Sequence, residues 1–148
     1  MGRMTTNKIV LTIDDDVAIT DLFSIILRTH GFDVISANNS EEGLRLINEK
    51  SPDVVTLDLM MPDVNGWDMC KRIRAFSKIP ILVLSAINDP AMVARVLDAG
   101  ADDFIVKPVP SAVLIARLNM LLRRSSGSGP LIKPDNVKRM LGTAPLSS

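Results

Sequence analysis

The sequence has few aromatic residues, one cysteine, no long hydrophobic run and no excess of charge of either sign. Aromatic residues make up 3% of the chain, so its core must be built from aliphatic side chains. The single cysteine, Cys70, excludes an intrachain disulfide and favours a reducing compartment. Because 17 basic residues balance 17 acidic ones, no overall field attracts nucleic acid or an anionic membrane.

The hydrophobic segments are too short for a membrane protein. The longest largely apolar stretch, IPILVLSAI at 79–87, falls far below the length that crosses a bilayer. The N-terminal MGRMTTNK has no apolar segment of the kind found in a signal peptide. We therefore expect one cytoplasmic domain at 7–124. A disordered N-terminus at 1–6, part of which resembles a cloning remnant, would precede it, and a flexible tail at 125–148 with no second domain would follow.

Short β-branched segments alternate with amphipathic ones along the chain. Strands are expected at 8–13, 32–37, 53–58, 79–85 and 103–107. Between and after them, apolar residues recur every three or four positions, which indicates helices. These helices are expected from the first strand to about 30, from 40, over 66–76, from 90 to about 99, and over 110–124. Five alternations with short connections predict an α/β fold, a doubly wound five-stranded parallel sheet with helices on both faces.

The periodicity also predicts which side chains point inward. On the first helix we expect a stripe that includes Leu22 and Leu27, on the third one that ends at Phe76, and on the fourth one that includes Val96 and Leu97. Asp89 and Pro90 are expected to begin the fourth helix by capping.

Reactive residues gather where the predicted strands end. In an open parallel sheet, ligands bind beyond the carboxyl ends of the strands. The second strand contributes nothing reactive there, whereas the other four contribute Asp14, Asp15, Asp16, Asp58, Ser85 and Lys107. Asp16 fits a helix-capping role better than a ligand role. An alternative for the whole acidic run is that it only favours a helix N-terminus.

The carboxylates at these ends suit a hard cation. Asp14, Asp15 and Asp58 would repel one another unless a positive charge lay between them. Oxygen ligands of this kind are typical of Mg²⁺ or Mn²⁺ sites. Lys107 adds a fixed positive charge and Ser85 a hydroxyl. Such a set is suited to receiving a phosphoryl group on a carboxylate, and Asp58, at the exit of an apolar strand, is the candidate nucleophile.

Four motifs carry a family resemblance: TIDDDV, TLDLMMPDVNG, VLSA and GADDFIVKP, in this order. Over about residues 7–124 the chain resembles the receiver domain of a two-component response regulator, and most of all the receivers of winged-helix transcription regulators. The resemblance implies a flavodoxin-like sheet with strand order 2-1-3-4-5. It also implies that Asp58 accepts a phosphoryl group from a sensor histidine kinase or a phosphotransfer protein.

The resemblance assigns roles to the other residues of the site. Asp15 would bind Mg²⁺ directly and Asp14 mostly through water, while Asp58 and the Met60 backbone carbonyl complete the protein ligands. The resemblance further implies that Ser85 and Lys107 contact the phosphoryl oxygens. Phe104 would be the aromatic switch that moves with Ser85, and the Lys107–Pro108 bond is often cis in the family.

Two other functions fit parts of the sequence. A phosphatase of the haloacid-dehalogenase type also uses an aspartate nucleophile, but on its first strand in a D-x-D-x-T/V pattern. Here Asp14 and Asp16 match, whereas Ala18 occupies the last position and no cap domain fits in this length. The second alternative is a pseudo-receiver, an interaction module that is never phosphorylated.

The face formed by the fourth helix, fifth strand and fifth helix is expected to pair two copies after phosphorylation. Asp103 and Arg117 fit the opposite charges that related receivers interlock there, while Val93 and Val113 stand where relatives commonly carry charges. We therefore expect a homodimer held more by apolar contact than by charge. The alternative is that both valines pack inward in a monomer. No direct nucleic-acid binding and no membrane contact are expected.

Overall fold

The computed structural model describes residues 7–126, which form one parallel sheet flanked by helices. The sheet order is β2-β1-β3-β4-β5, so the predicted fold class and strand order are confirmed. The strands are β1 (Ile9–Ile13), β2 (Asp33–Ala37), β3 (Val54–Asp58), β4 (Ile81–Ser85) and β5 (Asp103–Val106). The helices are α1 (Val17–Thr29), α2 (Ser40–Lys50), α3 (Gly66–Arg74), α4 (Pro90–Asp98) and α5 (Ser111–Ser126).

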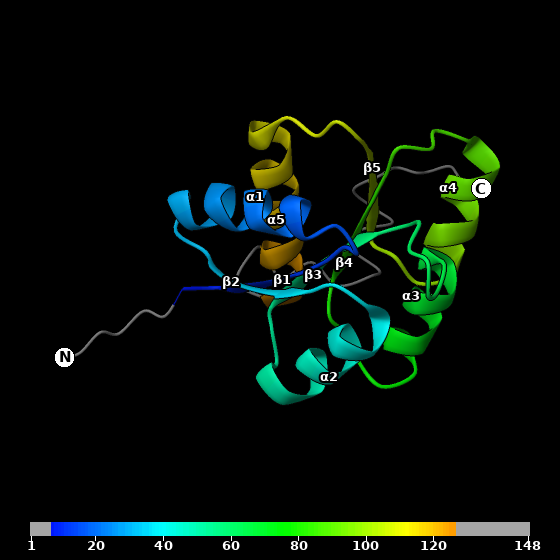
Figure 1. Ribbon diagram of the computed structural model, residues 1–148, viewed down its shortest axis with the longest axis horizontal. Helices are drawn as coiled ribbons and strands as arrows, with labels where there is room; N and C mark the ends of the chain where they lie inside the picture. Colours follow the sequence, from blue (N-terminus) through cyan, green and yellow to red (C-terminus); the bar gives the residue numbers. More distant parts are fainter. Residues whose placement is uncertain (1–6, 127–148) are drawn as a thin grey trace, which may run out of the picture.

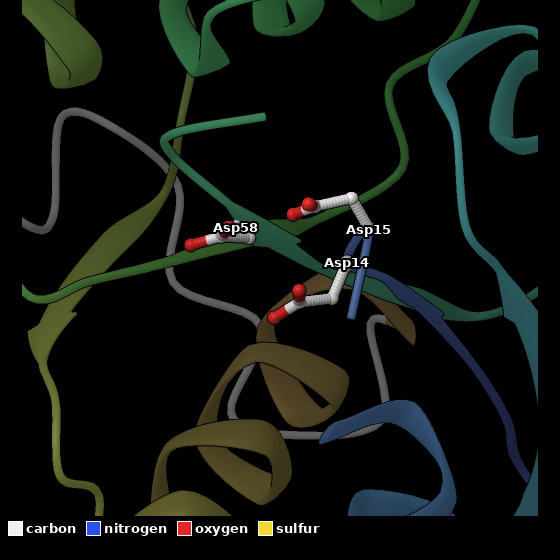
Figure 2. A group of neighbouring side chains, drawn as sticks. All are labelled: Asp14, Asp15 and Asp58. Carbon is white, nitrogen blue, oxygen red and sulfur yellow. The ribbon is translucent and has the colours of Figure 1, made fainter. Parts of the chain in front are cut away.

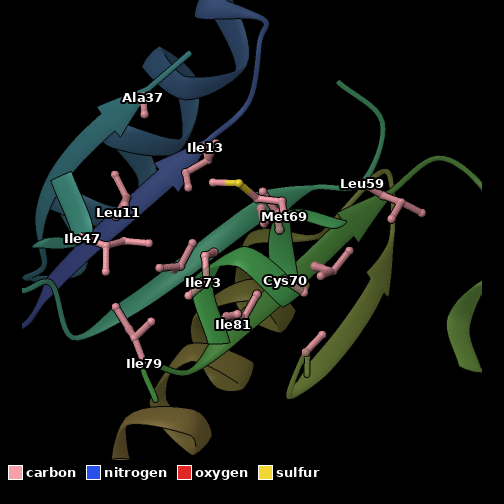
Figure 3. Close-up of a cluster of buried hydrophobic side chains, with 14 of the residues drawn as sticks. Leu11, Ile13, Ala37, Ile47, Leu59, Met69, Cys70, Ile73, Ile79 and Ile81 are labelled. Carbon is pink, nitrogen blue, oxygen red and sulfur yellow. The ribbon is translucent and has the colours of Figure 1, made fainter. Parts of the chain in front are cut away.

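The helices cover the two faces of the sheet unequally. Helices α1 and α5 lie on one face, and α2, α3 and α4 lie on the other (Figure 1). The larger core, shown in part in Figure 3, joins β1, β3 and β4 to α2 and α3 and contains the buried Met69, Cys70 and Ile73. Burial raises the pKa of the Cys70 thiol to about 12, so this cysteine is an inert core residue. The aliphatic core expected from the composition is present on both faces.

Local signals explain where the helices begin. The side chains of Asp16, Asn39, Asn65 and Asp89 each accept a hydrogen bond from a backbone N–H in the first turn of the helix that follows. These bonds satisfy N–H groups that have no partner within the helix. The predicted capping by Asp16 and by Asp89 with Pro90 is confirmed.

Three predicted inward side chains are exposed instead. Phe76 is 45% exposed because α3 ends at Arg74, which leaves Phe76 in the turn beyond the helix. Leu22 is 50% exposed because α1 presents the side of Thr20 and Leu27 to the sheet, and Leu22 lies off that side. Leu97 is 42% exposed on α4, where Val96 is the buried residue. An apolar pattern alone predicted a wider buried stripe than these helices have.

The ends of the elements differ from prediction by one or two residues. Strand β4 begins at Ile81 rather than at 79, since Pro80 has no N–H and the Ile81 N–H donates to Asp102 (2.8 Å). Helix α5 continues through Ser126, and the Ser125 hydroxyl donates to the Leu122 carbonyl near its end. The remainder of the predicted tail, 127–148, and the predicted N-terminus at 1–6 lie outside the described residues. Within residues 7–126 no helix has the length and apolar character to cross a membrane.

Candidate functional site

Three carboxylates meet at the carboxyl end of the sheet. Asp14 and Asp15 follow β1, and Asp58 is the last residue of the neighbouring strand β3 (Figure 2). One carboxylate oxygen from each residue lies within 4.8 Å of the others. Asp14 is buried and Asp15 is exposed, while the Asp58 side chain is 12% exposed. The cluster therefore opens to solvent on one side, as a site that exchanges ligands must.

Lys107, which follows the edge strand β5, forms ion pairs with two of the carboxylates. Its Nζ lies 3.2 Å from Asp58 Oδ1 and 3.3 Å from Asp14 Oδ2. The Lys107 N–H donates to the Ser85 carbonyl (2.8 Å), which fixes the chain just beyond β5 to the end of β4. The Lys107–Pro108 bond is cis, as the family resemblance implied.

The electrostatics of the cluster are unbalanced. Burial, followed by the nearby charge of Asp14, raises the pKa of Asp58 above its ordinary value, and Lys107 offsets only part of this effect. For Lys107, burial acts to lower the pKa, but the charges of Asp58 and Asp14 outweigh it and raise the pKa overall. One ammonium faces three carboxylates, so negative charge remains in excess.

This donor set fits a divalent cation of the hard type. Its side-chain ligands are all carboxylate oxygens, and one of them, Asp15, is exposed, which leaves room for water. Mg²⁺ and Mn²⁺ prefer such oxygen ligands, and Mg²⁺ keeps several of its waters in proteins. A bound cation would also offset the repulsion from Asp14, which adds to burial in raising the pKa of Asp58. The predicted metal residues Asp14, Asp15 and Asp58 are thus brought together.

The remaining predicted residues surround the cluster without all touching it. Ser85 is fully buried at the end of β4, and its hydroxyl oxygen accepts a hydrogen bond from the Ile87 N–H (3.0 Å) rather than contacting the carboxylates. Met60 has a side chain that is 50% exposed and forms an isolated bridge with Asn65. Phe104 is half-buried on β5 and packs against the larger core. Their proposed functional roles stay predictions.

Two polar residues near the site were not predicted from the sequence. Asn38, directly after β2, donates to the Asp14 carbonyl (2.8 Å). Asp63, in the loop after Asp58, accepts two hydrogen bonds from Ser40 at the start of α2. The second strand was predicted to contribute nothing reactive. Asn38 follows this strand and holds the backbone of Asp14, one of the predicted metal residues.

A match to a known protein family covers the residues of the site. The profile of the family described as "Response regulator receiver domain" matches residues 10–119. The chain is 43% identical over 115 residues to the transcriptional regulatory protein AfsQ1 of Streptomyces coelicolor, which covers 78% of this chain and 51% of that protein. It is 40% identical over 121 residues to the DNA-binding response regulator MtrA of Mycobacterium tuberculosis, covering 82% of this chain and 53% of MtrA. The chain thus spans about half the length of the curated relatives that it matches.

Solved structures show the same fold. The BeF3-activated N-terminal receiver domain of Klebsiella pneumoniae RstA has a TM-score of 0.75 at 31% identity and matches 78% of this chain and 99% of that one. A two-component response regulator from Clostridium difficile has a TM-score of 0.77 at 29% identity and matches 80% and 98%. The phosphatase alternative fails, since the matched family is a non-enzymatic signalling domain. The chain belongs to the response regulator receiver domain family of two-component systems.

Proposed function

We propose that this chain is a phosphoacceptor receiver and that Asp58 takes its phosphoryl group from a phosphohistidine of a sensor kinase or a phosphotransfer protein. The observation that carries the proposal is the position of Asp58. Its carboxylate lies at the open rim of the sheet, 3.2 Å from Lys107 and clustered with Asp14 and Asp15. A pseudo-receiver, which is never phosphorylated, has no need for these side chains to lie together.

The transfer follows from the chemistry of these groups. An Oδ atom of Asp58 attacks phosphorus and forms a P–O bond, while the P–N bond breaks and its electron pair stays on the donor imidazole. The Lys107 ammonium, which now pairs with Asp58 and Asp14, is within reach of a phosphoryl group on Asp58 and would neutralise its oxygens. The Ser85 hydroxyl would donate to another of these oxygens after leaving the Ile87 amide.

Asp14, Asp15 and Asp58, with the Met60 backbone carbonyl, would hold Mg²⁺ or Mn²⁺. When bound, the cation supplies positive charge against the transferring phosphoryl group. The acidic cluster supports this assignment because its negative charge exceeds what Lys107 balances.

We further propose that phosphorylation switches the face made of α4, β5 and α5. Movement of the Ser85 hydroxyl toward the phosphoryl group would open space for the half-buried Phe104 ring. Such a change is a shift between two populated states, so the unphosphorylated protein should already sample the active one.

The same face is the proposed homodimer interface. Arg117 donates to Asp103 within the chain (2.7 Å), so these two charges are already paired and would have to be shared with a second copy. Leu97 and Val113 are 42% and 37% exposed there, whereas Val93 is half-buried. Apolar contact is therefore the better-supported source of affinity. Sedimentation of the beryllofluoride-activated protein at low and high salt tests this, since an apolar dimer survives high salt and a monomer throughout rejects it.

The two relatives named above suggest the place of this receiver in signalling. AfsQ1 is a transcriptional regulatory protein and MtrA a DNA-binding response regulator, and each matches this chain over about half of its length. We propose that residues 7–124 supply the phosphorylation input of such a regulator. The chain's balanced charge supports a domain that does not itself contact DNA.

Phosphorylation by acetyl phosphate or phosphoramidate tests the function. The wild type should incorporate phosphate only when Mg²⁺ is present, and Asp58→Asn should not, because an amide is a poor nucleophile. Asp68→Asn is the matched control, as Asp68 is an exposed carboxylate on α3. A wild type that takes up no phosphate from either donor would favour the pseudo-receiver instead.

A further inference from the structure

The chain from Asn38 to Ser40, which joins β2 to α2 and includes the first residue of α2, contacts both loops that carry the predicted metal ligands. Its first contact is with the loop after β1. Asn38 Nδ2 donates to the Asp14 carbonyl (2.8 Å) and to the hydroxyl oxygen of Thr20 (3.1 Å), a residue that is 1% exposed. One amide group therefore ties the backbone of Asp14 to the first turn of α1.

The second contact is with the loop after β3. Both the N–H and the hydroxyl of Ser40 donate to Asp63 Oδ2, at 2.8 and 2.6 Å. Ser40 is 3% exposed, and these two bonds hold the pKa of Asp63 below its ordinary value. Asp63 lies in the same short loop as Met60, the predicted carbonyl ligand.

The loop that makes these contacts is itself fixed in place. The Asn39 side chain caps α2 by accepting from the Glu42 N–H (2.8 Å), and Glu42 accepts from the Asn38 N–H (3.1 Å). The first bond is an N-cap bond, and the second returns from the helix to the residue before the N-cap, so both fix the start of α2 to the chain that enters it. Asn38 and Ser40 thus project from one braced turn toward two different ligand loops.

We propose that this turn is a clamp that sets the spacing of the metal ligands, so that Asn38 and the Ser40–Asp63 pair are positioning residues for cation binding. The inference rests on the proposed function, because it concerns the same acidic site. Mg²⁺ tolerates little departure from octahedral geometry, and residues that orient ligands typically account for tenfold or more in metal affinity. Loss of the Asn38–Asp14 contact should let the loop after β1 move, and loss of the Ser40–Asp63 contact should let the loop after β3 move. Either movement would displace a predicted metal ligand.

Mn²⁺ binding to the full chain, followed by the paramagnetic resonance signal of the free ion, measures this without any phosphodonor. Asn38→Ala and Ser40→Ala change no charge. Asn38→Ala should weaken Mn²⁺ binding roughly tenfold, and Ser40→Ala should weaken it less, because the Ser40 N–H still donates to Asp63. Glu41→Gln is the control, since Glu41 stands beside Ser40 and pairs with Arg72 only at the surface (3.1 Å). Removing the Glu41 charge should leave the Mn²⁺ affinity nearly unchanged.

Asp63→Ala distinguishes the Ser40–Asp63 hydrogen bonds from a direct attraction between the Asp63 charge and the cation. If the hydrogen bonds matter, the Ser40→Ala/Asp63→Ala double variant should bind Mn²⁺ no more weakly than Asp63→Ala alone, because the two partners act as one unit. Fully additive losses would instead mean that the Asp63 charge acts through space, and would overturn the positioning role of the pair.

Thermal unfolding of the metal-free variants guards against a purely structural effect. Variants that melt lower than the wild type yet bind Mn²⁺ equally well would overturn the inference while leaving the proposed function intact. A wild type that binds no Mn²⁺ and takes up no phosphate would overturn both. Weakened binding in Asn38→Ala and Ser40→Ala, with Glu41→Gln unaffected, supports the clamp.

Discussion

Gly66, at the end of the loop that follows β3, packs closely against the backbone of Leu59, the residue after Asp58. Its N–H donates to the Leu59 carbonyl (2.6 Å). A Cβ added at this position would stand 2.8 Å from Leu59 Cα and 3.0 Å from the Leu59 carbonyl oxygen, as well as 2.6 Å from Leu59 Cδ1. The side-chain tip can rotate away, but the backbone atoms cannot. Gly66→Ala should therefore push the loop away from the residue that follows Asp58.

The expected cost of Gly66→Ala follows from this overlap. Forcing a methyl group into packed backbone typically costs about 1–3 kcal/mol. For a domain of this size, a loss near the middle of that range lowers Tm by roughly 8 °C. The displaced loop also carries Met60, so phosphorylation of Asp58 should slow as well.

Gly43→Ala is the matched control for this prediction. There the added Cβ would meet side-chain atoms and no backbone among its three nearest neighbours: Ile13 Cδ1 (2.7 Å), Ile13 Cγ1 (3.3 Å) and Met69 Cε (3.3 Å). Alanine also favours a helix interior over glycine by up to about 1 kcal/mol, which offsets the crowding. Thermal unfolding by circular dichroism compares the two variants. Equal Tm changes, or no change for Gly66→Ala, would refute the argument from backbone contact.

Three further predictions concern the site and its switch. In the folded state the pKa of Asp58 is raised above 3.8, so the folded protein favours the protonated carboxyl. The stability that this protonated form contributes is fully present below pH 3.8 and is lost as the pH rises through the folded pKa. Metal-free Asp58→Asn should thus melt above the wild type at pH 7 and lose this advantage in acid, and an equal or lower Tm at pH 7 contradicts the sign. Met60 and Ile87 offer no polar group to orient a water near the acyl phosphate, so Met60→Asn should speed its decay, and an unchanged half-life of the phosphorylated protein would show that these side chains do not shield it. Phe104→Ala should keep phosphorylation but reduce the chemical-shift changes on α4, and equal shifts in both proteins would exclude a switch through this ring.

The sequence was most informative where the sheet topology itself places residues. Asp14 and Lys107 directly follow two strands of one parallel sheet and Asp58 ends a third, so the alternation of strands and helices alone predicted that they meet. Asn38 and Asp63 could not be found this way, because their partners depend on the path of exposed loops that carry no periodicity. Phe76 was misplaced for a related reason, as the apolar period continued past the end of α3. The contacts of Ser85 depend on a side-chain rotation that no sequence pattern encodes.

Mapping the phosphoryl group within the chain tests whether Asp58 is the phosphoacceptor. After phosphorylation with phosphoramidate and Mg²⁺, borohydride reduction converts an aspartyl phosphate to a stable alcohol that peptide mass spectrometry can locate. We expect one modified position, Asp58, in the wild type and none in Asp58→Asn. Modification at Asp14 or Asp15, or at no aspartate in a protein that has taken up phosphate, would contradict it.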